Sequence, residues 1–173
     1  GRLTEAGWKA AFRNAPATAG TPFAVAWRYG EEGVWMGLRT DTPVTKPRLE
    51  VALLYRFAVP LKHAPRWRVT VDQGGVSDHR FTERGATRRR ACNWSGRTVP
   101  ADDGCRAELF IPYADVGGAA AVAPVTRWRV RLVLREATPN ERLVVQWPAT
   151  ATAWPATGTI VVFTQHSTTE RRM

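Results

Sequence analysis

Short segments in which apolar and polar residues alternate recur along the chain, and they constrain the fold more than any other feature. In the segment 66–72 every odd-numbered residue is apolar and every even-numbered residue is polar or charged. Successive side chains of a β-strand point to opposite faces, so this pattern predicts a strand with one buried face. Twelve prolines are scattered between such segments, and each removes a backbone donor that a long helix would use. We therefore expect many short strands and little helix.

Nine or ten strands can be placed in this way. Two of them flank the segment 102–104 (Asp-Asp-Gly), a tight-turn signal because glycine adopts positive φ readily, and Pro112 ends the second of the two. An all-β chain of this kind is expected to form an antiparallel β-sandwich of the immunoglobulin or jelly-roll type. The strands are expected at 23–28, 34–39, 49–57, 66–72, 87–93, 105–111, 128–135, 143–147 and 158–163.

The length of 173 residues is that of one domain. We expect residues 1–166 to form the sandwich and the polar residues 167–173 to form a frayed tail. No stretch reaches the roughly 18 apolar residues that a membrane helix needs. Because Gly1 is not a natural first residue, we expect the segment to come from a longer protein, and the lack of a visible signal peptide says nothing about export.

The chain is strongly basic, with a formal net charge of +10 that comes almost entirely from arginine. Such a charge is typical of proteins that bind a polyanion, such as nucleic acid, an anionic membrane or an acidic polysaccharide. The alternative is that arginines alternate along strands, as at 127–131, and simply form solvated sheet surface. Only residues 88–90, three successive arginines, form a dense block.

Two cysteines, Cys92 and Cys105, flank the turn at 102–104. If segments 87–93 and 105–111 pair across this turn, the two thiols can face each other, and we expect a disulfide. Closing so short a loop would stabilise the fold by roughly 3 kcal/mol and would indicate an oxidising compartment. The alternative is two unpaired, buried thiols in a cytosolic protein.

Several motifs in succession resemble family 9 carbohydrate-binding modules and their relatives. The resemblance extends from Arg2 to Phe163, keeps the order of the elements, and implies the same antiparallel sandwich. The motifs are a Gly-x-Leu-x-Glu-x-x-Trp opening at 1–8, a strand ending at Trp27 before an acidic turn, an Asp-x-Pro exit at 41–43, a Gly-x-x-x-Asp-x-Arg loop at 74–80, and an x-Glu-x-x-Ile-Pro strand at 107–112.

The resemblance also implies a sugar site. In these modules a sugar at the end of a glycan lies between aromatic rings, while a Glu and an Arg on neighbouring strands bind its hydroxyls; the matching residues are Glu50, Arg68 and Trp154. An aromatic face covers the apolar C–H face of a pyranose, and charged groups form strong hydrogen bonds with its hydroxyls. The alternatives are a plain cross-strand ion pair for Glu50 with Arg68 and a core position for Trp154.

The chain departs from the family pattern just before Glu50, where the second ring of the clamp is expected. That stretch is 44–47, and it ends in Pro47 where an acidic residue is expected. Either Trp147, Trp94 or Trp35 supplies the second ring from elsewhere, or this chain has lost the terminal-sugar site. Of the three, Trp147 is the candidate carbohydrate-binding residue.

No cofactor, metal or catalytic site is expected. The three histidines are isolated, no Cys-x-x-Cys occurs, and no motif supports structural calcium. Relatives of these modules include haem-binding domains that bind the iron through Met with His or Lys. An alternative function is therefore a haem-binding electron-transfer domain in which Met36 and His166 bind the iron. A Met in a strand, however, is more often a core residue. No catalytic Ser-His-Asp order or phosphate loop stands out, and Glu108 stands alone.

The resemblance therefore implies a non-catalytic, monomeric module that keeps an attached polysaccharide-degrading enzyme, secreted or on the cell surface, near its substrate. If the arginines serve this function, the preferred glycan is acidic; nucleic acid is not an expected partner. The alternatives are the haem-binding domain and a structural or protein-interaction domain that kept the fold and lost the site.

Overall fold

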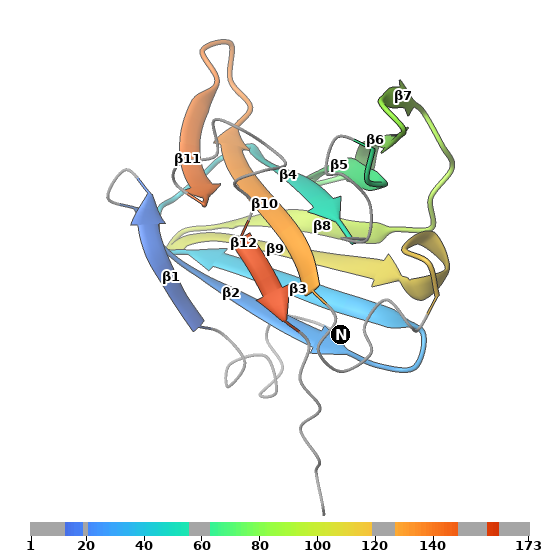
Figure 1. The fold of residues 1–173 in the computed structure, drawn as a ribbon. Coiled ribbons are helices and arrows are strands. Elements are labelled where there is room, and N and C mark those ends of the chain that lie inside the picture. Colours follow the sequence, from blue (N-terminus) through green and yellow to red (C-terminus); the bar gives the residue numbers. More distant parts are fainter. Residues whose placement is uncertain (1–12, 19–20, 56–62, 119–126, 149–158, 163–173) are drawn as a thin grey trace, which may run out of the picture.

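Two antiparallel β-sheets face each other in the computed structural model of the chain, which describes residues 13–18, 21–55, 63–118, 127–148 and 159–162 (Figure 1). This confirms the predicted all-β sandwich. The first sheet, which we call sheet A, has the strand order β1 (Arg13–Thr18), β2 (Thr21–Tyr29), β3 (Gly33–Thr40), β9 (Gly104–Pro112) and β8 (Ser95–Ala101).

The second sheet, sheet B, contains the remaining strands, and β12 (Thr159–Val162) pairs with its strand β10. The one helix in the described part of the chain is the short 3₁₀ turn η1 (Tyr113–Asp115). The strand order of sheet B is β11 (Arg142–Trp147), β10 (Arg127–Glu136), β4 (Pro47–Leu54), β5 (Arg66–Asp72), β6 (Gly75–Glu83) and β7 (Ala86–Arg88).

The core lies between the two sheets and is made by the apolar members of the alternating segments. Fully burying one large aliphatic or aromatic side chain stabilises a fold by about 1.5–3 kcal/mol, so these residues dominate the stability of the sandwich. At most 1% of the surface is exposed for Met36, Leu38, Leu49, Val51, Leu53, Trp67, Val69, Leu109, Ile111, Trp128, Val130 and Leu132.

The tight turn before β9 is confirmed, but the partner strand differs from the expected one. Gly104 has a φ of 149°, and a Cβ there would overlap the carbonyl oxygen of Thr40, so only glycine fits. The strand that pairs with β9 across this turn is β8 and not the segment 87–93. In this pair Ala101 lies opposite Gly104. Pro100 is tolerated inside β8 because β8 is an edge strand, where one side of the backbone needs no partner.

The expected disulfide between Cys92 and Cys105 is wrong, since both are free thiols. Cys105 lies at the start of β9, opposite Pro100. Cys92 lies beyond the other end of that strand, where the next residue, Asn93, donates its backbone N–H to Asp115 Oδ2 at 2.8 Å. The length of β9 separates the two regions by about 25 Å, whereas bridged Cα atoms lie within about 7 Å. The expectation failed because it assumed the wrong strand register.

Two further segments differ from expectation. The loop expected at 74–80 is mostly strand, because β6 begins at Gly75 and pairs with β5 along its length. Strand β1 was not predicted, and it pairs with β2 at the edge of sheet A. The opening motif at 1–8 and the tail at 167–173 lie outside the described residues.

Candidate functional site

Glu50 and Arg68 lie on the adjacent strands β4 and β5, and both side chains leave the outer face of sheet B, as the sequence predicted. Thr70 lies directly opposite Glu50, and Ala52 lies opposite Arg68, so the two charged residues are diagonal neighbours. The distance from Arg68 Nε to Glu50 Oε1 is 3.8 Å, and 51% and 34% of the two side chains are exposed. This distance is too long for a hydrogen bond, so both groups keep most of their capacity to bind a ligand.

Outward side chains form three rows across sheet B, and the Glu50–Arg68 pair spans two of them. The register places Gln146, Val133, Glu50, Thr70 and Asp78 in the first row. The second row consists of Arg131, Ala52, Arg68 and Arg80. The third row consists of Arg129, Leu54, Arg66, Thr82 and Thr87.

The first row adds polar groups that sequence reasoning missed. Glu50, Thr70 and Asp78 border a hollow of about 410 Å³. Asp78 Oδ2 accepts a hydrogen bond from Arg80 Nε at 3.1 Å, and its Oδ1 lies 3.6 Å from Arg89 Nη2. Carboxylates that accept hydrogen bonds and hydroxyls that both donate and accept them suit a ligand rich in hydroxyl groups.

Trp147, the candidate for the second ring, lies on the inner face of sheet B, away from the Glu50–Arg68 pair. It lies opposite Leu132, a core residue, and its ring meets Phe23 of sheet A edge to face at 6.4 Å. Trp147 therefore packs between the sheets at the edge of the core. Its neighbour Gln146 takes the outward position in the row of Glu50. Gln146 is the polar residue directly before Trp147, and neighbouring strand residues face opposite sides, so this pair is the signal that could have identified Gln146.

The other candidates for a second ring also lie elsewhere. Trp94 is 5% exposed and packs on Trp67 with ring centres 6.0 Å apart. Trp35 lies on β3 of sheet A, where it contacts Phe110 with ring centres 4.7 Å apart. Val44, at the position where the family pattern expects a ring, is itself a core residue that is 2% exposed. None of these residues reaches the outer face of sheet B.

Trp154 and His166 lie outside the described residues. Met36, the other half of the haem alternative, is fully buried in the core opposite Leu109, as a structural strand methionine would be. Among the described residues no three His, Cys, Asp or Glu side chains are grouped as a metal ion would require. The same residues contain no helix with the length and apolar character needed to cross a membrane.

Of the comparisons with known proteins, the one with solved structures bears on the fold. No protein-family model and no curated protein sequence matches the chain. Among solved structures, a family 9 carbohydrate-binding module from Caldicellulosiruptor kristjanssonii in complex with cellotriose superposes with a TM-score of 0.63 at 14% identity, over 95% of this chain and 88% of that one. A structure of such a module from the same organism in complex with glucose gives the same TM-score and identity, over 95% of this chain and 90% of that one. The chain thus has the fold of family 9 carbohydrate-binding modules.

Proposed function

We propose that this chain is a non-catalytic carbohydrate-binding domain that holds a glycan on the outer face of sheet B. The observation that carries the proposal is the pair Glu50 and Arg68, which lie on adjacent strands, point outward and contact each other only loosely at 3.8 Å. The two solved structures with this sandwich that contain cellotriose and glucose support the choice of ligand class.

The chemistry of the pair suits sugar hydroxyls. A hydroxyl can donate to the Glu50 carboxylate and accept from the Arg68 guanidinium, and hydrogen bonds to charged groups are about twice as strong as neutral ones. Thr70 lies opposite Glu50 and adds a neutral hydroxyl beside the carboxylate. We propose that Trp154 supplies an aromatic platform for the sugar ring.

The wider role that we propose is to keep an attached enzyme, secreted or on the cell surface, near its polysaccharide. The domain would act as a monomer and without a cofactor. The net charge of +10 supports an acidic polysaccharide as the preferred ligand.

A glycan array followed by calorimetric titration of the best ligand tests the proposal. We expect the wild-type domain to bind at least one class of polysaccharide, and Glu50→Gln to weaken that binding about tenfold, since a charged hydrogen bond contributes about 1.5–3 kcal/mol. Glu31→Gln is the matched control, because it removes the same charge from the exposed turn between β2 and β3. Binding to no glycan, or equal losses in both variants, would contradict the proposal.

A further inference from the structure

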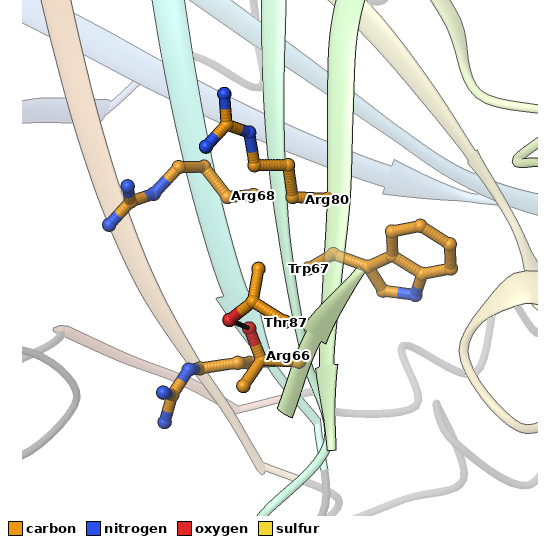
Figure 2. Close-up of a pocket in the computed structure, with 6 residues that line it drawn as sticks. Arg66, Trp67, Arg68, Arg80 and Thr87 are labelled. Atoms are coloured by element: carbon orange, nitrogen blue, oxygen red, sulfur yellow. Dashed lines mark hydrogen bonds between the residues drawn. The ribbon is translucent and has the colours of Figure 1, made fainter. Parts of the chain in front are cut away.

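A second hollow lies beside the Glu50–Arg68 pair, and three arginines border it. Arg66 and Arg68 come from β5 and Arg80 from β6, and with Trp67, Thr82 and Thr87 they line a volume of about 400 Å³ (Figure 2). Figure 2 shows the three arginine side chains leaving the sheet on one side, whereas Trp67 points to the other. No carboxylate is among these lining residues.

The positive charges of Arg68 and Arg80 have neighbouring carboxylates on only one side. Arg68 and Arg80 lie directly opposite each other on neighbouring strands, where like charges are unfavourable. The carboxylates nearest to them, those of Glu50 and Asp78, both belong to the row on one side of this pair and contact the Nε atoms at 3.8 and 3.1 Å. Asp78 is also shared with Arg89.

On the other side of the pair the positive charge increases. Arg66 lies in the next row, opposite Thr82, and it has no ion pair within the described residues. Farther along the row of Arg68, beyond Ala52, lies a further arginine, Arg131. The described part of this row contains no carboxylate, so an anion from outside the chain would offset its positive charge.

Two hydroxyls at this hollow add a further donor. Thr82 Oγ1 and Thr87 Oγ1 lie 2.8 Å apart, and Figure 2 marks the hydrogen bond between them. This bond uses one of the two hydroxyl hydrogens, so the other can point to a ligand acceptor. The polar side-chain groups that line the hollow are thus three guanidinium groups, which donate only, and a hydroxyl pair with a hydrogen to spare.

We infer that this hollow, the Arg66–Arg68–Arg80 pocket, binds an anionic substituent of the glycan, a carboxylate or a sulfate. The inference rests on the proposed carbohydrate binding and names the substrate class of that surface. The planar guanidinium fork matches the paired oxygens of either anion. An anion between Arg68 and Arg80 would also offset the repulsion between these directly opposed charges.

The neighbouring residues favour an acidic glycan over nucleic acid. Glu50 and Asp78 lie one row away from the pocket, and their carboxylates would repel a continuous phosphate backbone. The same carboxylates accept hydrogen bonds from the hydroxyls of a sugar that carries one acidic group. The mixed surface therefore fits a chain that alternates hydroxyls with separated negative charges.

Calorimetric titration of the domain with paired polysaccharides tests the inference. Dextran sulfate is compared with dextran, and polygalacturonate with its methyl ester, so that each pair differs only in charge and the two pairs distinguish sulfate from carboxylate. We expect at least one charged member to bind tenfold or more tightly than its neutral partner, with an affinity that falls as salt rises. Arg66→Gln and Arg80→Gln should each weaken binding of the charged member severalfold, and Arg66→Gln should do so without affecting a neutral glycan.

Arg97→Gln is the matched control, because it removes the same charge from β8 of sheet A, where Arg97 is exposed. A loss with Arg97→Gln equal to that with Arg66→Gln would overturn the inference in favour of a net-charge effect. Equal binding of charged and neutral members would overturn the inference and the preference for an acidic polysaccharide, and would leave the proposed carbohydrate binding intact. Binding to no glycan would overturn both the inference and the proposed function. Tighter binding of a DNA duplex through the same arginines would also overturn it.

Discussion

The inner and outer faces of β4 and β5 are made by the same two strands, yet their environments differ completely. On the inner face Val51 and Val69 lie opposite each other and are fully buried. On the outer face, one residue along each strand, Glu50 and Thr70 lie opposite each other and are partly exposed. Alternation thus places Val51 and Val69 in the core between the sheets and leaves Glu50 and Thr70 partly exposed on the same two strands.

This comparison shows that fold and function can be separated by single steps along a strand. A substitution on the inner face removes packing that solvent cannot replace. A substitution on the outer face removes a contact that water largely replaces. Stability and binding should therefore respond to different residues of the same hairpin.

The largest effect is expected at Trp67. Its ring is 1% exposed and packs on Phe81 and Trp94, and its Nε1–H donates to the carbonyl oxygen of Asp115 at 2.9 Å. We expect Trp67→Ala to lower the free energy of unfolding by about 3–5 kcal/mol. Trp67→Phe keeps most of the packing and loses the hydrogen bond, so it should cost less. Urea denaturation measures both, and a cost below 1 kcal/mol for Trp67→Ala (about the value of an exposed ion pair) would contradict the separation of the faces.

Glu50 should show the opposite behaviour. Its ion pair with Arg68 is exposed and long, and such pairs contribute about 0–1 kcal/mol to stability. We expect Glu50→Gln to unfold at nearly the wild-type urea concentration while its glycan affinity falls. A large loss of stability in this variant would show that the outer face also holds the fold together.

The two thiols differ in burial, since Cys105 lies on the inner face of sheet A and Cys92 lies at the margin of the core. Burial raises the pKa of the Cys105 thiol to about 12. Burial also raises the pKa of Cys92, helped by the nearby Asp115 carboxylate and opposed by a hydrogen bond from the Trp94 backbone. Since thiolates are the reactive species, we expect iodoacetamide to modify native Cys92 slowly and Cys105 more slowly still. Unfolded, non-reduced protein should take up two labels by mass spectrometry, and a disulfide would reveal itself as no uptake.

The smallest effect is expected at Glu136, a charged residue at the end of β10 with a structural role. Its carboxylate accepts hydrogen bonds from the Thr45 backbone N–H at 2.9 Å and from Arg142 Nε at 3.0 Å. The Thr45 bond and then the Arg142 bond lower the pKa of Glu136. A lowered folded-state pKa stabilises the fold above the unfolded value of about 4.3, and this stabilisation is lost as the pH falls through the folded value.

We therefore expect Glu136→Gln to be slightly less stable than the wild type at neutral pH, with the difference vanishing as the pH falls below about 4. Urea denaturation at several pH values measures this. A difference that persists unchanged at acidic pH would show that the charge of Glu136 plays no part.

Local pattern was enough to predict much of this structure. The period of two in 66–72 placed Trp67 inward and Arg68 outward, and the same parity placed Glu50 outward. These predictions succeeded because the face of a side chain in a strand depends only on its position along that strand. The glycine turn before β9 was predicted for a similarly local reason, the positive φ of Gly104.

Features that depend on pairing between strands were harder to predict. Cys92 was placed opposite Cys105 because the edge strand β8 was not recognised. The pocket of Arg66 and Arg80 requires the order β5–β6, and segment 74–80 had been taken for a loop. Trp147 and Gln146 are a different case, since neighbouring residues of a strand face opposite sides and the polar Gln146 is the one that lies in the row of Glu50.

The central claim, that a glycan binds the outer face of sheet B, is tested most directly by backbone amide NMR during titration with the best ligand from the array. The account predicts that shift changes concentrate on β4, β5 and β6, around Glu50, Arg68 and Arg80, while β3 and β9 of sheet A stay unchanged. Changes concentrated on β3 and β9, around Trp35 and Phe110, would place the binding surface on the opposite face of the molecule and contradict the account.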